Sequence, residues 1–316
     1  MRTGRTRVLA AALAACLLAI VVPALADAST TLPAPGTAKA IRHLVDASPS
    51  ITVLPRNLVP SLAEVHLDNP WSIYKSLRWP NCPTVTSCIL GATTSNRVIV
   101  LFGDSHALMW LPAVDPIVQH DGYKLVLVWS PNCPAASVTY WNWPTRSYAT
   151  GCDAWRSSTI TAIRRLHPHA VLLASESADR WASNKALMTD AQWQVGITKT
   201  ITLLRSASTR VGVIGDIPTF NLALPDCLAA YPTSVRKCGV PLLNPLLKNR
   251  GHQQAEIAAS KATGALYVNT IPWLCTSSWC SPVVGSMVSY INDWHVTATY
   301  AHYLSGVFGL ALKPLL

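Results

Sequence analysis

Short apolar segments alternate with longer amphipathic ones from Arg97 to the C-terminus, and this alternation is the strongest constraint on the fold. Predicted strands cover residues 98–102, 123–129, 170–174, 210–214 and 265–268. Predicted helices cover residues 107–120, 153–167, 190–206, 251–263 and 295–310, with Asp153 expected to cap the second. Apolar strands separated by helices are typical of a parallel sheet covered on both faces. The sequence therefore predicts an α/β fold around a parallel sheet.

A Gly-Asp-Ser-His turn follows the first predicted strand, at the edge of the sheet where ligands bind in such folds. Gly103 permits a tight turn, and Asp104 can accept hydrogen bonds from nearby backbone N–H groups. Ser105 is the candidate nucleophile, because a strand-to-helix turn can expose its hydroxyl and aim N–H groups at an oxyanion. Asp and Ser are also common helix caps, so the turn alone fits a structural role equally well.

His295 is the candidate base that a serine nucleophile needs. It is expected to open the last helix at the same edge of the sheet, and Asn292 and Asp293 lie in the loop before it. A histidine with a carboxylate close in sequence matches a base and the residue that orients it. His106 is a weaker candidate, because neighbours in a helix point to different faces.

The N-terminus predicts a signal peptide over residues 1–26. Arginines at positions 2, 5 and 7 precede an apolar run from Val8 to Val22, and Ala24-Leu25-Ala26 forms a cleavage site. The run is shorter than the roughly 20 residues of a membrane span, although an uncleaved N-terminal membrane anchor is the alternative. We therefore expect a secreted or cell-envelope protein.

Residues 27–80 are expected to form a lead and wrapping segment before a single domain over residues 81–316. Residues 29–39 are rich in Pro, Ala and Thr and are expected to be flexible. Prolines punctuate residues 40–77, which are expected to be irregular.

Eight cysteines remain once Cys16 leaves with the signal peptide, and an even number in an exported chain suggests disulfides. Proximity in sequence selects four local pairs: Cys82 with Cys88, Cys133 with Cys152, Cys227 with Cys238, and Cys275 with Cys280. The Cys-x-x-Cys pairs with histidine partners that a zinc site would need are lacking, so neither a metal nor a cofactor is expected.

The chain is basic, with a formal net charge of +10 that falls to +7 when three arginines and no acidic residues leave with the signal peptide. Such an excess suits contact with anionic cell-wall polymers or lipid surfaces, or simply a mildly basic soluble protein. No basic run is interleaved with aromatic residues, so nucleic acid is not an expected partner.

In the turn that carries Ser105 and the segment that carries His295, the chain resembles the SGNH (GDSL-like) hydrolase superfamily. It resembles more closely the SGNH domain fused to bacterial membrane O-acyltransferases of the acyltransferase-3 type. The resemblance extends roughly from Val53 to the C-terminus and rests on five motifs: LFGDSHALMWLPA (101–113), CDAWR (152–156), IGDIPTF (214–220), PWLCTSSWCSPVVG (272–285) and NDWHVTATYAHYL (292–304). It implies a three-layer, flavodoxin-like α/β/α sandwich with a parallel sheet of about five strands.

The resemblance also implies roles for the site residues. Ser105 would attack an acyl carbonyl, with its own N–H and the turn from Gly103 helping to stabilise the oxyanion, and His295 would be the base. The family usually places an aspartate three residues before this histidine, where this chain has Asn292. We expect Asp293 to orient His295 instead; Asn292 as a neutral orienter, or a Ser105–His295 dyad, are the alternatives.

Two further features bear on activity. The wider superfamily supplies oxyanion donors from a glycine and an asparagine in later loops, and residues 130–133 here have no glycine and residues 175–177 no asparagine. This departure argues against a highly active esterase more than it argues against a transferase. Trp294, beside the base, is the expected platform for a sugar ring, with core packing of the tryptophans as the alternative.

The sequence thus predicts an exported serine esterase or O-acyltransferase. Its expected substrates are acyl esters, acetyl first among them, of cell-envelope carbohydrate, cleaved or transferred by a monomer through a Ser-His-Asp site. One alternative is a non-catalytic carbohydrate-binding or accessory domain. Another is a protein that works with a separate membrane acyltransferase, which hands the acyl group to Ser105.

Overall fold

Five parallel strands form the centre of the main sheet, as the alternating pattern predicts. They are β2 (Val98–Gly103), β3 (Lys124–Trp129), β6 (Ala170–Ala174), β7 (Arg210–Ile214) and β9 (Leu266–Val268). The order across the sheet is β3-β2-β6-β7-β9, and β1 (Cys88–Gly91) pairs antiparallel with β3 at one edge. The computed structural model describes residues 32–75, 82–142, 144–177, 182, 184–243 and 250–316; the predicted signal peptide lies outside them.

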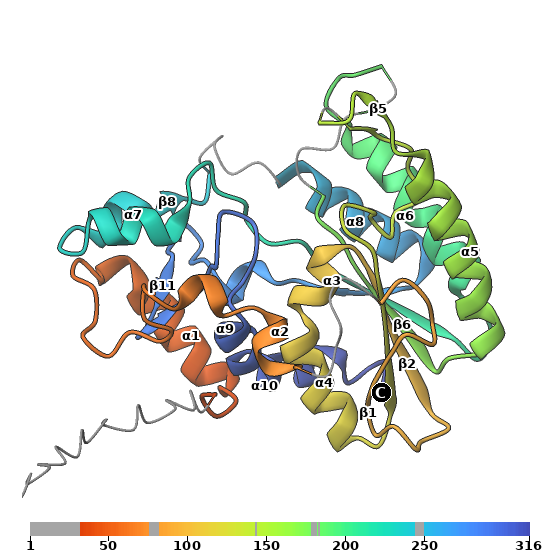
Figure 1. Cartoon of the computed structure of the whole chain (residues 1–316), viewed down its shortest axis with the longest axis horizontal. Coiled ribbons are helices and arrows are strands. Elements are labelled where there is room, and N and C mark those ends of the chain that lie inside the picture. Colours follow the sequence, from red (N-terminus) through yellow and green to blue (C-terminus); the bar gives the residue numbers. More distant parts are fainter. Residues whose placement is uncertain (1–31, 76–81, 143, 178–181, 183, 244–249) are drawn as a thin grey trace, which may run out of the picture. The chain divides into compact units, whose positions relative to one another are not determined.

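Helices cover both faces of this sheet, so the three-layer α/β/α prediction is confirmed (Figure 1). One face is covered by α5 (Thr150–Leu166), α6 (Asp190–Leu204) and α8 (Arg250–Thr263). The other is covered by α4 (Leu111–His120) and α10 (Ser305–Leu312), and α9 (Ala298–Tyr303) packs against α4. The remaining elements are short: α1 (Ala38–Ala47), α2 (Pro70–Ile73), α3 (Ser105–Met109), α7 (Leu224–Ala230), β4 (Trp141–Asn142), β5 (Ser147–Tyr148), β8 (Val240–Pro241), β10 (Trp279–Cys280), β11 (Val283–Val284) and β12 (Met287–Val288).

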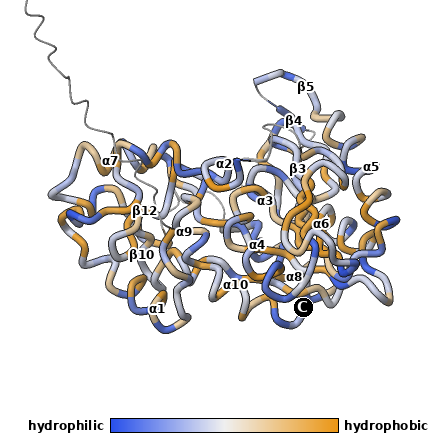
Figure 2. The backbone as a smooth tube through the Cα atoms, turned by 60° about the horizontal axis from the view of Figure 1, so that its bottom comes forward, coloured by the Kyte–Doolittle hydropathy of each residue, from blue (hydrophilic) through white to orange (hydrophobic). Residues whose placement is uncertain are grey.

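The strand β2 shows why its sequence is apolar throughout. Ile99 and Leu101 pack into the core on one side of the sheet, while Val100 and Phe102 pack into the core on the other. Successive side chains of a strand point to opposite faces, so a strand buried on both faces has no polar positions. Figure 2 shows hydrophobic residues concentrated in the strands beside the β3 and α6 labels.

Two predicted helices differ from the observed ones. The helix expected over residues 107–120 is two helices, α3 and α4, that meet at Trp110. Pro112 lacks the N–H that would bond to the preceding turn, and it lies in the first turn of α4, where that N–H is not needed. The helix expected from His295 begins only at Ala298, where Thr297 caps it, and is interrupted at Leu304. His295 therefore lies in the loop before α9, and the prediction that it opens the last helix is wrong.

Two smaller predictions are also corrected. Asp153 is not the cap of α5, because the helix begins at Thr150; its carboxylate accepts hydrogen bonds from Arg156 and Thr139 instead. The segment expected to be a flexible lead and then irregular contains α1. Its Ile41 and Val45 lie one turn apart and are both buried in the hydrophobic core. The boundary between residues 80 and 81 stays a prediction.

The four predicted disulfides are all present among the described residues, with the pairing that sequence proximity indicated. One of them joins Cys133, in the loop after β3, to Cys152 in the first turn of α5. Disulfides of this number are typical of proteins that fold in an oxidising compartment, so they indicate an extracytoplasmic location. Within the described residues, no helix combines the length and hydrophobicity that crossing a membrane requires.

Candidate active site

Ser105 and His295, which are 190 positions apart in sequence, meet at the carboxyl end of β2. The Oγ atom of Ser105 lies 2.9 Å from Nε2 of His295, a hydrogen-bond distance. Ser105 is the first residue of α3, and the side chain of Asp104 caps that helix. The structure therefore brings together the two residues that the sequence singled out as nucleophile and base.

The turn that carries Ser105 is held from both sides. A Cβ atom added at Gly103 would lie 1.7 Å from the carbonyl oxygen of Ala174, so only glycine lets β2 approach β6 here. The buried carboxylate of Asp104 accepts hydrogen bonds from the N–H of His106 at 2.9 Å and from the N–H of Glu176 at 3.1 Å. Asp104 thus ties the turn to the loop after β6.

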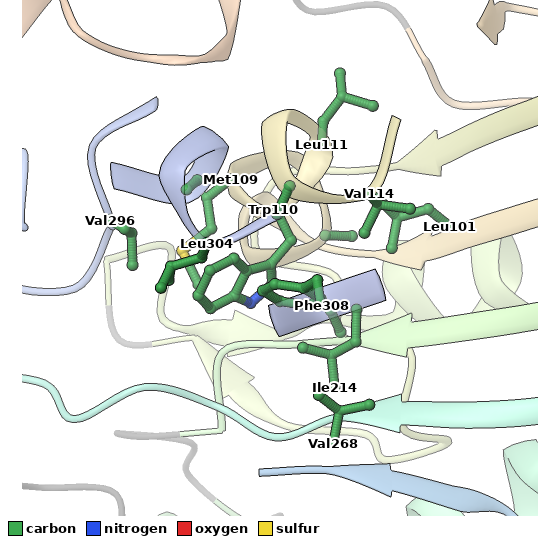
Figure 3. Packing of buried hydrophobic residues seen from close by; sticks show 14 of the residues in the cluster. Leu101, Met109, Trp110, Leu111, Val114, Ile214, Val268, Val296, Leu304 and Phe308 are labelled. Carbon is green, nitrogen blue, oxygen red and sulfur yellow. The ribbon is translucent and has the colours of Figure 1, made fainter. Parts of the chain in front are cut away.

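The short helix α3 is fastened to the core by Trp110 at its end. The indole of Trp110 is buried and packs against Phe308 of α10, with ring centroids 4.9 Å apart. Figure 3 shows this contact and the neighbouring side chains of Leu304 and Ile214. A rigid support of this kind fixes where the Ser105 hydroxyl points.

Asn292 contacts the other nitrogen of the His295 ring. Its Oδ1 atom accepts hydrogen bonds from the backbone N–H groups of Trp294 and His295, at 3.0 and 2.8 Å. Its Nδ2 atom consequently faces Nδ1 of His295, 3.1 Å away. An amide nitrogen donates, so Nδ1 accepts and the proton of the neutral imidazole lies on Nε2.

This geometry bears on the choice between Asn292 and Asp293. Asn292 contacts the ring through its Nδ2 atom, 3.1 Å from Nδ1 of His295. The backbone carbonyl of Asp293 accepts a hydrogen bond from the N–H of Phe220 at 2.9 Å. Which of them acts in catalysis stays a prediction.

A second, fully buried pair lies behind His295. Nδ1 of His106 lies 2.6 Å from Oδ1 of Asp216, and the other carboxylate oxygen of Asp216 accepts hydrogen bonds from the N–H and hydroxyl of Ser177. The rings of His106 and His295 pack edge to face with centroids 5.2 Å apart. This pair was not predicted from the sequence; the available signal was Asp216 in the IGDIPTF motif, at the end of a strand that reaches the same edge of the sheet.

The two histidines have opposite protonation preferences. Burial alone would lower the pKa of His106, but the charge of Asp216 and its hydrogen bond overcome this effect and raise the pKa to about 9. Burial would raise the pKa of Asp216, yet His106 holds it below its usual range. Burial lowers the pKa of His295 to about 3, and the charge of His106 contributes in the same direction. His295 is therefore neutral at physiological pH, as a general base must be.

Four backbone N–H groups in the loops after β3 and β6, where further oxyanion donors would lie, are already engaged. The N–H of Glu176 bonds to Asp104, and that of Ser177 bonds to Asp216. In the loop after β3, the N–H of Ser130 bonds to the carbonyl of Gly103, and that of Cys133 bonds to Ser130. This agrees with the departures seen in the sequence, so the N–H of Ser105 stays the predicted donor.

A cavity of about 390 Å³ opens beside Ser105 and His295. Trp294, which is not part of the cavity wall, is 44% exposed, and its ring centroid lies 6.3 Å from that of His295, so it is available to a ligand beside the base. Among the described residues, no group of three His, Cys, Asp or Glu side chains is arranged to hold a metal ion.

Comparisons with known proteins identify a family and a similar fold. Residues 74–309 match the family described as SGNH domain (fused to AT3 domains). The periplasmic domain of a Salmonella ser. Paratyphi A lipopolysaccharide acetyltransferase is similar, with 20% identity, a TM-score of 0.55, and coverage of 77% of this chain and 97% of that domain. Est24, a carbohydrate acetylesterase from Sinorhizobium meliloti, is 10% identical and has a TM-score of 0.43, and the match covers 70% of this chain and 100% of that one. At these identities the likeness concerns the fold, and no curated protein matches the sequence.

Proposed function

Because this chain belongs to the family of SGNH domains that are found fused to AT3 domains, we propose that it is an exported acyl-ester hydrolase or O-acyltransferase with Ser105 as its nucleophile. The observation that carries the proposal is the 2.9 Å contact between Ser105 Oγ and His295 Nε2 at the end of the central strand β2. A serine hydroxyl next to an imidazole that accepts its proton is the arrangement that acyl transfer requires.

In the proposed reaction, Ser105 Oγ attacks the carbonyl carbon while Nε2 of His295 takes the hydroxyl proton. The same proton then passes to the departing alcohol, leaving an acyl-enzyme. Water would release the acyl group as an acid, whereas a sugar hydroxyl would accept it. The charge on the tetrahedral oxygen would be met by the N–H of Ser105 at the start of α3.

Asn292 makes this reaction slow in the resting site. As a base, His295 must carry its proton on Nδ1, but that atom faces the Nδ2 donor of Asn292. Turning the amide over would present Oδ1 to Nδ1–H at the cost of the two bonds that Oδ1 accepts from the backbone. We therefore expect slower turnover than in an enzyme with a carboxylate at this position, unless Asp293 moves to take its place.

The proposed substrate is an acyl ester of cell-envelope carbohydrate. The four disulfides support an extracytoplasmic site of action. The exposed Trp294 beside the base supports a sugar, because an indole face packs against a sugar ring while its N–H stays in water. A separate membrane acyltransferase is the proposed donor if the chain acts as a transferase.

The test is the intact mass of the oxidised protein after incubation with a fluorophosphonate probe. Wild type should gain one adduct, and Ser105→Ala should gain none. Ser130→Ala, which removes another serine at the same edge of the sheet, is the matched control and should be labelled normally. A wild-type protein that stays unlabelled would contradict a catalytic serine.

A non-catalytic carbohydrate-binding domain is the second candidate. The engaged N–H groups of Glu176 and Ser177 favour it, because they leave fewer oxyanion donors than the wider superfamily has. This candidate predicts glycan binding that Ser105→Ala leaves unchanged and that Trp294→Ala weakens.

A further inference from the structure

The cavity beside the nucleophile is built from three separate parts of the chain. Besides Ser105 and His295, its wall consists of Asn69, Pro70, Trp71, Leu108, Met109, Ile291, Asn292 and Val296. The first three belong to α2 and its cap, and they precede residue 74, where the family match begins. One wall of the cavity is therefore contributed by a segment that the matched domain does not include.

This wall segment is anchored firmly to the site. Asn69 caps α2 through a 3.0 Å bond from the N–H of Trp71 to its Oδ1. The indole of Trp71 packs against buried Trp129, with ring centroids 6.0 Å apart. Asp68, the residue before Asn69, accepts two further hydrogen bonds. Its carbonyl accepts from the N–H of Ala298, and its carboxylate accepts from the N–H of Thr299 at 3.1 Å.

The cavity suits an apolar ligand. Most of its wall is apolar, and among the described residues it includes no charged side chain. The Oδ1 atoms of its two asparagines already accept backbone N–H groups, at Trp71 for Asn69 and at Trp294 and His295 for Asn292. A sugar would find few hydrogen-bond partners on this wall, whereas a hydrocarbon chain needs none.

Its size exceeds what an acetyl group needs. A methyl group is about as large as a water molecule, whose share of the liquid is about 30 Å³. The cavity of about 390 Å³ is more than tenfold larger. At about 30 Å³ for each methyl-sized group, it has room for a hydrocarbon chain of roughly eight carbons or more.

We propose that this cavity is an acyl-binding pocket, and that the protein prefers an acyl group of several carbons to acetyl. The inference rests on the proposed function, since the chain enters the pocket from a carbonyl held at Ser105. Trp71 and Ile291 set the accepted length as the walls contributed by α2 and by the loop before His295. The carbohydrate alcohol occupies the side of Trp294, which is not part of this wall.

The first experiment measures kcat/KM of the full, oxidised chain for the p-nitrophenyl esters of acetate, butyrate, hexanoate and octanoate. Wild type should gain about fourfold for each methylene that leaves water, until the pocket is full. Ile291→Trp, which fills the pocket from a partly exposed position, should lose this gain, so that its kcat/KM for octanoate no longer exceeds its kcat/KM for acetate. Leu310→Trp, at a site 65% exposed on α10, is the matched control and should behave as wild type. Equal rates for all esters in wild type would overturn the pocket.

A second measurement tests the pocket without turnover. Octanoate should bind to wild type, Ser105→Ala and Leu310→Trp by calorimetry, and it should bind at least tenfold more weakly to Ile291→Trp and Trp71→Ala. Absence of octanoate binding to wild type would refute the pocket even if the fluorophosphonate labels Ser105. Octanoate binding without any labelling would refute the proposed catalytic serine and leave an apolar-ligand site in place.

Discussion

Asn292 donates to Nδ1 of His295 across 3.1 Å, because its own oxygen is committed to the N–H groups of Trp294 and His295. The base is therefore held by a donor at the position where an acceptor would activate it. The side chain at position 292 thus sets which nitrogen of His295 carries the proton. Replacing its amide nitrogen by an oxygen should therefore change the reactivity of Ser105.

Asn292→Asp should speed up the reaction of Ser105. A carboxylate would accept from Nδ1–H and leave Nε2 free to take the serine proton, an effect worth about 10²-fold or more. The measurement is the second-order rate of fluorophosphonate labelling. Asp293→Asn is the matched variant and should have little effect; a large loss there, with no gain in Asn292→Asp, would identify Asp293 as the residue that orients the base.

The buried pair of His106 and Asp216 should make stability depend on pH. The pKa of His106 is about 9 in the folded protein and about 6.5 in the unfolded chain, so the folded state binds more protons between these values. The stabilisation is complete below about pH 6.5 and is lost as pH rises through 9. Urea unfolding of wild type at about pH 6 and about pH 10 should show this fall.

The partner residue gives the complementary test. Asp216→Asn would leave a buried histidine without its countercharge, and we expect a loss of about 3–5 kcal/mol in the free energy of unfolding near neutral pH. The fall in stability above pH 6.5 should be smaller in this variant than in wild type. An unchanged pH dependence would show that other groups cause it.

Glu256 should contribute a separate slope at lower pH. It is fully buried, and burial raises its pKa to about 8, with the charge of Asp216 adding to the effect. The folded state therefore holds a proton that the unfolded chain has already released above pH 4.5, so stability falls as pH rises from 4.5 through 8. Glu256→Gln, which can still accept from Nε1 of Trp193, should remove this slope in urea unfolding while keeping the stability at pH 4.5.

Removal of the Cys133–Cys152 disulfide should destabilise the loop beside the site. It closes a loop with a sequence separation of 19, and its loss as a double alanine variant should cost about 3 kcal/mol. The Cys275–Cys280 bridge has a separation of 5, and its removal should cost less, about 2 kcal/mol. Equal losses, measured by urea unfolding, would contradict the loop-length argument.

The sequence predicted the fold best where burial alone decides the structure. The strands β6 and β7 have their predicted bounds because β6 is an apolar run buried throughout and β7 is buried at every position after the exposed Arg210. The edge strand β1 was not predicted, since it is four residues long and alternates between buried and exposed positions. The start of α9 was misplaced because Val296 pairs with Tyr290, a contact that helical periodicity cannot reveal.

The residues of the site were likewise predictable from the sequence only in part. Ser105 and His295 were predictable because each stands in a recognisable motif at an end of an expected element. The choice between Asn292 and Asp293 depends on how one loop turns its side chains, which spacing does not encode. The contact of His106 with Asp216 joins residues 110 apart in sequence, and it becomes visible only when β2 and β7 are placed in one sheet.

The anchoring of Asp68 gives the N-terminal segment a mechanical role. Asp68 holds the backbone at Ala298 and Thr299, only three and four residues beyond His295, while the adjoining Trp71 lines the cavity. Asp68 thus supports both the segment that carries the base and the wall of the cavity. A chain shortened to residues 74–309 would keep both Ser105 and His295. It would lose Asp68, however, and with it the hydrogen bonds that hold the backbone just after the base.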